Sequence, residues 1–240
     1  MKQTLAIGLV LLLLAGTLAA VGCANGQGGN GKQADLPTLD VGNKWVYQWL
    51  TNTTQSTCTM EVTGEDTKDG KDCYVLDVSF APPLSPPLTP LCEGCLSKGT
   101  QMLDKSTLLP LELKGTCTQG STEYTVESTH TYSFDSPLWP LKQDKQVTVP
   151  SETDKTVVTT KAPGTEGSCT DEDSGDRVYK IEAVEQVTVA AGTFECFRVV
   201  RYDGYGIKEY TYWYSATVKK EVKWTDHDTG DSAELESYSV

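Results

Sequence analysis

Apolar and polar residues alternate along most of the chain after about residue 40, and this period-two pattern predicts β-strands. Residues 44–50, KWVYQWL, are aromatic and β-branched, as strands prefer. The stretch TEYTVESTHTYSF puts every second side chain on one face, namely Tyr124, Val126, Ser128, His130 and Tyr132. The polar segment TGEDTKDGKD lies between two such runs and predicts a hairpin. We therefore expect an all-β chain with mostly antiparallel pairing.

Three short patterns recur in the same order in both halves of the chain. LDVGNKWVY aligns with LKQDKQVTV, GKDCYVLDVSF with GTFECFRVVRYD, and LDKSTLLPLEL with WYSATVKKEVK. The alignment superposes Cys73 on Cys196, and it predicts two related β-meander units, 36–117 and 137–240, joined by a strand region at 118–136. The alternative is that two unrelated meanders look alike. Neither unit can bury an apolar face alone, so we expect one curved antiparallel sheet or half-barrel, or a sandwich.

The first 22 residues have the composition of an export signal. Lys2 precedes an apolar run, and small residues lead to Ala20-Val21-Gly22-Cys23. This pattern resembles the lipobox of prokaryotic lipoproteins, which implies cleavage after residue 22 and lipid attachment to Cys23. Residues 23–35 are Gly-rich and predict a flexible tether to a cell membrane, with the protein facing the periplasm or the exterior. The alternative is an ordinary signal peptide with a chance cysteine.

The chain is acidic, with a formal net charge of −13, and this charge opposes nucleic acid as a partner. Seven of the eight cysteines follow Cys23, so at least one is free or pairs between chains. Cys92 and Cys95 form a C-x-x-C motif. We expect a local disulfide or two buried thiols there, because a zinc site would need two further ligands and the chain has only two histidines.

Two acidic segments, residues 171–176 and 226–231, share the sequence pattern Asp-x-Asp-[Ser/Thr]-Gly-Asp, and this pattern predicts turns. Their carboxylates are either solvated or calcium ligands, and the candidate ligands are Asp171, Asp173, Asp176, Asp226, Asp228 and Asp231. His130 lies beside Glu127 and Ser128, but no nucleophile–base motif accompanies it. We expect neither an enzyme nor a cofactor.

The segments VTVAAGTFECFRVVRYDG and YTYWYSATVKKEVKW, with LDVGNKWVYQW near the front, resemble the DUF3108-like group of exported β proteins. That group is related in fold to the lipoprotein carriers LolA and LolB, so the resemblance implies a curved sheet that holds acyl chains. The expected function is a non-enzymatic, lipid-anchored module that binds a hydrophobic ligand. The alternatives are a structural or protein-interaction lipoprotein with a filled core, and a thiol or metal protein built on Cys92 and Cys95.

Overall fold

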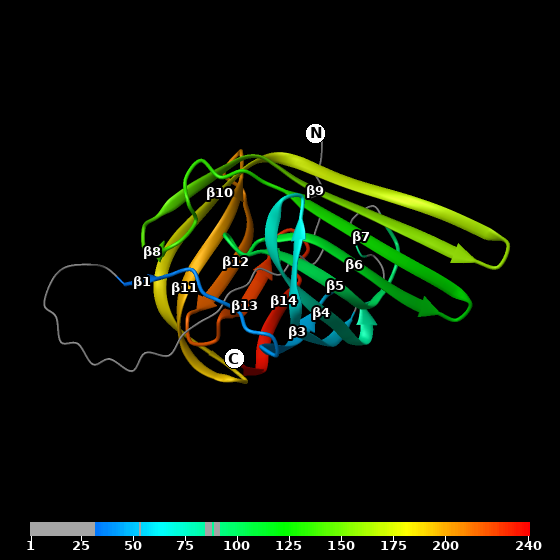
Figure 1. Ribbon diagram of the computed structural model, residues 1–240, viewed down its shortest axis with the longest axis horizontal. Coiled ribbons are helices and arrows are strands. Elements are labelled where there is room, and N and C mark those ends of the chain that lie inside the picture. Colours follow the sequence, from blue (N-terminus) through cyan, green and yellow to red (C-terminus); the bar gives the residue numbers. More distant parts are fainter. Residues whose placement is uncertain (1–31, 53, 85–87, 89–91) are drawn as a thin grey trace, which may run out of the picture.

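The computed structural model describes residues 32–52, 54–84, 88 and 92–240 (Figure 1). The predicted export signal and Cys23 lie outside these residues. In the described part of the chain, we found no helix with the length and apolar character needed to cross a membrane.

Fourteen strands lie in the described residues. They are β1 (Gln33–Ala34), β2 (Lys44–Leu50), β3 (Gln55–Lys68), β4 (Lys71–Leu84), β5 (Leu96–Asp104), β6 (Pro110–Gln119), β7 (Thr122–Thr131), β8 (Leu141–Lys142), β9 (Gln146–Ala162), β10 (Thr165–Val189), β11 (Gly192–Asp203), β12 (Lys208–Ser215), β13 (Lys220–Asp226) and β14 (Ser232–Ser239).

Twelve strands form a closed antiparallel barrel in the order β10-β11-β12-β13-β14-β2-β3-β4-β5-β6-β7-β9. The all-β, antiparallel prediction is confirmed, but the sheet closes instead of remaining a half-barrel. Closure depends on two long-range pairs, β14 with β2 and β7 with β9, which leave neither half of the sheet with an open edge. β7 lies inside the segment 118–136 and is a full barrel strand. The internal duplication and its unit boundaries stay predictions.

The predicted hairpin joins β3 to β4, and both strands run through the polar segment almost to the turn. Asp69 and Gly70 form the turn with φ values of 51° and 79°. Two successive positive φ values are typical of a type I′ turn, for which Asp-Gly is a preferred sequence.

Aromatic side chains of β2 fill one part of the barrel interior. Trp45, Tyr47 and Trp49 are fully buried. The Trp45 indole Nε1 donates to the carbonyl oxygen of Val218 at 2.8 Å, and the Trp49 ring meets Trp224 edge-on with centroids 4.8 Å apart. The alternation along β2 therefore directs large rings inward, and each polar tip that donates a bond does so to a backbone carbonyl.

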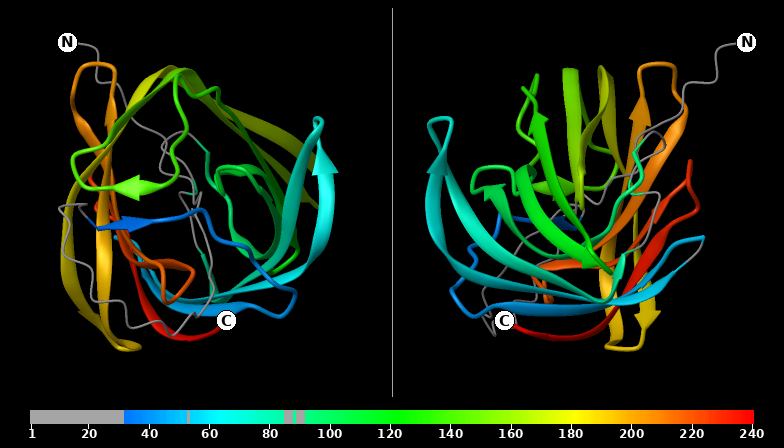
Figure 2. Two further views of the ribbon diagram at one scale, coloured as in Figure 1. Left: turned by 60° about the vertical axis from the view of Figure 1, so that its left-hand side comes forward. Right: turned by 90° about the vertical axis from the view of Figure 1, so that its right-hand side faces the viewer.

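One end of the barrel is crossed by a segment that we call the strap, residues 133–145 together with β1. β1 pairs with β8, and in the left view of Figure 2 this pair crosses in front of the barrel interior. Leu138 and Leu141 of the strap are buried, and Trp139 Nε1 donates to the carbonyl oxygen of Thr107 at 2.9 Å. Residues 33–34, which the sequence assigns to the flexible tether, are thus held against the barrel.

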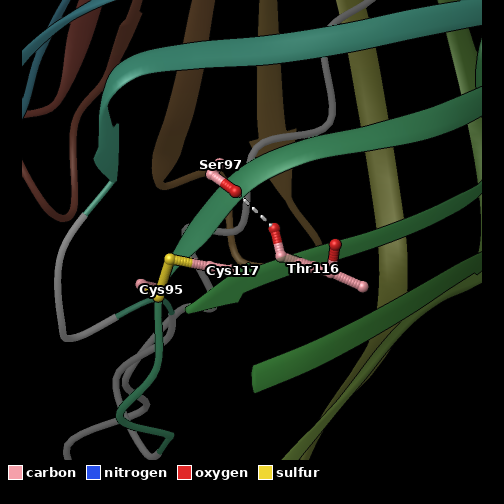
Figure 3. The surroundings of a disulfide bond; sticks show 4 residues. All are labelled: Cys95, Ser97, Thr116 and Cys117. Atoms are coloured by element: carbon pink, nitrogen blue, oxygen red, sulfur yellow. Dashed lines mark hydrogen bonds between the residues drawn. A yellow bond between two sulfur atoms is a disulfide. The ribbon is translucent and has the colours of Figure 1, made fainter. Parts of the chain in front are cut away.

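Two disulfides brace the barrel, and they correct the prediction of a local pair. Cys92 is bonded to Cys169 of β10, and Cys95 is bonded to Cys117 of β6 (Figure 3). Beside the second bond, Ser97 Oγ donates to the carbonyl oxygen of Thr116 at 2.8 Å. The C-x-x-C segment lies between β4 and β5 in the sequence. Cys92 is bonded to β10 and Cys95 to β6, so the two cysteines connect this segment to two different strands.

The other three cysteines after Cys23 are free and buried: Cys58, Cys73 and Cys196. The prediction of at least one free cysteine is confirmed.

Candidate functional site

The barrel interior contains two adjoining features, a buried network of charged side chains and an aromatic pocket beneath the strap. Tyr179 of β10 belongs to both. Its hydroxyl lies 3.2 Å from both carboxylate oxygens of Glu152, and its ring lines the pocket. We describe the charged network first.

Alternation along β7 and β9 places the charged network on the inner face. Val126, Ser128 and His130 share one face, as the sequence predicts, and that face is buried here. On β9, residues 152, 154, 156 and 158 are buried in the same alternating manner. The register pairs His130 directly with Asp154, which brings the imidazole to the β9 carboxylates.

His130 lies between two carboxylates. Its Nε2 is 3.1 Å from Glu152 Oε1 and its Nδ1 is 3.3 Å from Asp154 Oδ1. Burial alone lowers the pKa of His130, but Asp154 and Glu152 outweigh burial, so the pKa is raised overall. An imidazole whose two nitrogens both face carboxylates is well suited to its doubly protonated form.

Two arginines neutralise the remaining carboxylates. Arg201 Nη1 lies 2.8 Å from Glu152 Oε1, and Arg201 Nε lies 2.9 Å from Glu209 Oε2. Arg177 contacts Glu209 through Nε at 2.9 Å and also contacts Asp173. Burial by itself would raise the pKa of Glu152, but Arg201 and the imidazole lower it to about 2.

Within the described part of the chain, His130, Glu152 and Asp154 form the one group with metal-ligand character, with one ligand atom from each lying within 4.8 Å of the others. However, both imidazole nitrogens already face carboxylates, and Arg201 already contacts Glu152. A metal ion would have to displace a guanidinium and a proton. The arrangement is an ion network that joins β7, β9, β10, β11 and β12, although His130 Nδ1 and Asp154 Oδ1 face each other without a well-formed hydrogen bond.

The acidic segment 171–176 does not form the predicted turn. It lies in the middle of β10, where Asp171 pairs with Thr156 and Asp173 with Asp154. Asp171 is buried, and Asp176 accepts a hydrogen bond from the backbone N–H of Ser151 at 3.1 Å. The long ladder between β9 and β10 overrides the local turn preference of Asp, Ser and Gly.

The second acidic segment does form a turn, between β13 and β14. The Asp226 carboxylate accepts backbone N–H groups of Asp228 at 2.8 Å and Thr229 at 3.0 Å, which is the side-chain geometry of an Asx turn. Burial and the neighbouring Asp226 raise the pKa of Asp231 to about 6. Calcium binding at this turn stays a prediction.

The aromatic pocket lies beneath the strap, has a volume of about 40 Å³, and combines rings, aliphatic groups and one carboxyl. Its lining residues are Thr107, Leu108, Leu138, Trp139, Leu141, Tyr179, Val199, Tyr212, Tyr214 and Glu221. One water molecule needs roughly 10–15 Å³ on this measure, so the pocket has room for about three. A larger open hollow of about 630 Å³ shares Thr107 with the pocket and lies beside the strap residue Phe134.

Two buried polar atoms of the pocket residues have no hydrogen-bond partner among the described residues, Glu221 Oε2 and Tyr214 Oη. The nearest charge to the carboxyl is Lys220 Nζ, 3.6 Å from Glu221 Oε2. Burial raises the pKa of Glu221 to about 7, and burial followed by Glu221 raises the pKa of Tyr214. Buried polar atoms usually have a partner, so this pair marks the part of the pocket with free hydrogen-bonding capacity.

Sequence reasoning missed both interior features. The run YTYWYS indicated core packing, and Tyr212 and Tyr214 do point inward, but their place in a pocket depends on β10, β11 and the strap. A usable indication of the ion network was present at Arg201, a charged residue at a buried position of a largely apolar strand. Such a residue needs an interior partner.

Comparisons with known proteins give weak structural likeness only. No family model matches the chain, and no match was found among curated proteins. One similar solved structure is a candidate lipoprotein from Parabacteroides distasonis, with 11% sequence identity, a TM-score of 0.34, and coverage of 83% of this chain and 96% of that one. Another is a candidate exported protein with a YmcC-like fold from Bacteroides fragilis, with 10% identity, a TM-score of 0.38, and coverage of 87% and 100%. The chain is similar to these proteins at a level too low to transfer a function.

Proposed function

We propose that this chain is an exported lipoprotein, anchored to a membrane through Cys23, that acts as a non-enzymatic binding module. The anchor rests on the Ala20-Val21-Gly22-Cys23 pattern. Because β1 pairs with β8, the predicted tether would consist of residues 24–31, and a Gly-rich link of that length would reach about 15 Å. The barrel would therefore stay close to the membrane surface.

The observation that supports a binding role is the aromatic pocket with two buried polar atoms that lack a hydrogen bond, Tyr214 Oη and Glu221 Oε2, the second of which has Lys220 Nζ at 3.6 Å. Binding sites are mostly apolar concavities with a few polar groups that orient the ligand. Here the rings of Tyr179, Tyr212 and Tyr214 supply apolar surface, and Glu221 and the Tyr214 hydroxyl supply the orienting groups. The strap forms one wall, so movement of a short surface segment would admit a ligand.

The volume of the pocket favours a compact ligand over an acyl chain. The volume of about 40 Å³ accommodates roughly three water molecules. A membrane acyl chain has many more than three methylene groups, and each is about as large as a water molecule. An acyl chain would enter only after Leu138, Trp139 and Leu141 had moved away from the barrel. We therefore propose a compact hydrophobic molecule with one polar head as the ligand.

A second candidate function is a structural or protein-interaction lipoprotein with a filled core. The observation in its favour is the dense packing around Trp45, Tyr47 and Trp49, which are fully buried. The outer face of β2 to β7 carries an open, polar hollow of about 660 Å³ that a protein partner would contact. Lys44 and Glu61 form an ion pair at its margin.

Native mass spectrometry of the mature lipoprotein, extracted in a mild detergent, distinguishes the two functions. We expect a small molecule bound at about one per chain, lost in Glu221→Gln and retained in the control Glu185→Gln, whose carboxylate pairs with Arg198 outside the pocket. A ligand-free wild-type mass, or equal retention in both variants, would favour the second candidate.

The anchor is tested separately by Cys23→Ser. We expect the variant to leave the membrane fraction while its circular dichroism spectrum stays that of the wild type. Retention of Cys23→Ser in the membrane fraction after a salt wash would contradict lipid attachment at this residue.

A further inference from the structure

We infer that the aromatic pocket binds a compact, methyl-substituted ammonium group, an inference that rests on the proposed binding function. Three properties of the pocket support this ligand class: its rings, its charge environment and its lack of oxygen ligands.

The rings provide the surfaces that attract an organic cation. Trp139, Tyr179, Tyr212 and Tyr214 all line the pocket. Trp139 meets Tyr214 edge-on at 5.2 Å between centroids, and its Nε1 bond to the Thr107 carbonyl holds the indole in position. Quaternary ammonium groups are recognised in this way, by several aromatic rings that enclose the methylated nitrogen.

The same barrel already holds cations against rings. The Arg201 guanidinium lies 4.5 Å from the centroid of the Tyr210 ring, and Lys220 Nζ lies 5.4 Å from that of Trp45. Neither of these cations lines the pocket. The aromatic interior of this fold therefore contacts cations at two places, although burial still lowers the pKa of Lys220.

One carboxyl of the pocket is available to a cation. Glu221 lines the pocket, and its charged neighbour Lys220 lies 3.6 Å from Oε2 without lining the pocket. Glu152, beyond the Tyr179 hydroxyl, is already paired with Arg201 and His130. A ligand ammonium would therefore compete with Lys220 for the Glu221 carboxyl.

The lining excludes small inorganic cations and suits methyl groups. Calcium needs about six to eight oxygen ligands, and the Thr107 and Tyr179 hydroxyls are already bonded to Tyr132 and Glu152, which leaves the side-chain oxygens of Glu221, Tyr212 and Tyr214. Leu108, Leu138 and Leu141 present aliphatic surface that methyl groups would contact. A trimethylated nitrogen with its first methylene has about five heavy atoms, more than the roughly three water molecules that the pocket holds, so the ligand would enter with a small outward shift of the strap.

The test compares choline with the isomer of dimethylbutanol in which an uncharged carbon atom replaces the choline nitrogen. The dissociation constants are measured by isothermal titration calorimetry of the mature lipoprotein in a maltoside detergent. We expect choline to bind roughly tenfold more tightly than the alcohol, because cation–π attraction in a desolvated site is worth about one factor of ten or more. Equal affinities would overturn the cation inference while leaving the proposed binding function in place. Binding of neither compound would also overturn the cation inference, whereas the proposed binding function is decided by the native mass spectrum.

Pocket variants locate the binding. Glu221→Gln should weaken choline binding at least about fivefold and leave the alcohol unaffected, whereas Glu185→Gln should change neither. Trp139 is half-buried in the strap, so its replacement should preserve folding, and Trp139→Leu should weaken choline binding more than Trp139→Phe does. Choline binding that is indifferent to both Glu221→Gln and Trp139→Leu would overturn the assignment to this pocket.

Discussion

Removal of Arg201 should destabilise the barrel strongly. Its guanidinium contacts Glu152 at 2.8 Å and Glu209 at 2.9 Å, and its side chain is 8% exposed. Arg201→Met keeps the length and apolar stem of the side chain but leaves two buried carboxylates without this cation. Breaking a buried ion pair on one side costs about 3–5 kcal/mol, because the remaining charge stays desolvated.

The expected loss converts into a clear thermal shift. For a domain of 150–250 residues, 1 kcal/mol corresponds to roughly 2–4 °C, so Arg201→Met should lower the Tm by about 6–20 °C. Thermal unfolding followed by far-ultraviolet circular dichroism measures this, and urea unfolding gives the free energy. Arg198→Met is the matched control, because Arg198 is 33% exposed and pairs with Glu182 and Glu185 on the outer face. We expect that control to lose less than about 1 kcal/mol.

A double variant separates unpaired charge from lost packing. If an uncompensated carboxylate causes the loss, Arg201→Met combined with Glu152→Gln should be more stable than Arg201→Met alone. A loss below about 1 kcal/mol for Arg201→Met, or no recovery in the double variant, would refute the ion-network argument.

Three further predictions address other parts of the barrel. Burial raises the pKa of Glu221 from its ordinary value of 4.5 to about 7, so the folded protein holds the proton of this carboxyl more tightly than the unfolded chain does. The resulting stabilisation is fully present below pH 4.5 and is lost as the pH rises to about 7. Urea unfolding across this range should show a falling free energy of unfolding, and Glu221→Gln should flatten that fall. Cys95→Ala with Cys117→Ala opens a disulfide of sequence separation 22 and should cost about 3 kcal/mol in urea unfolding, an outcome that a loss near zero would contradict. A Cβ on Gly99 would lie 2.4 Å from the Lys114 carbonyl oxygen, so Gly99→Ala should lower the free energy of unfolding by about 1–3 kcal/mol. A Cβ on Gly167 would meet nothing within 4 Å, so Gly167→Ala should be close to neutral. Equal effects of the two substitutions would contradict the steric argument.

Local pattern predicted the strands and the direction of their side chains. The alternation in residues 122–134 correctly placed Val126, Ser128 and His130 on one buried face, and Asp69-Gly70 formed the predicted hairpin turn. These features depend on the two-residue repeat of a strand and on backbone preferences at a turn, both of which act within a few residues.

The same local reasoning failed where partners outside the short segment compete with it. The segment 171–176 has turn-forming residues, yet β9 pairs with it along almost its whole length. The C-x-x-C spacing suggested a local bond, yet Cys92 reached Cys169 across 77 residues. The deciding partner is the preceding strand of a long hairpin in the first case and a cysteine on a remote strand in the second, and both lie outside the short segment from which the prediction was made.

The sequence by itself determined that this chain is all-β and antiparallel, which side chains of several strands face inward, and that Cys23 follows a lipobox-like segment. Only the tertiary structure decided that the sheet closes through β14–β2 and β7–β9, and that Trp139, Tyr214 and Glu221 meet in one pocket. The physical reason is that a period-two pattern specifies a face but not a partner. Pairing between remote strands, which the pattern does not encode, brings together the residues that form the site.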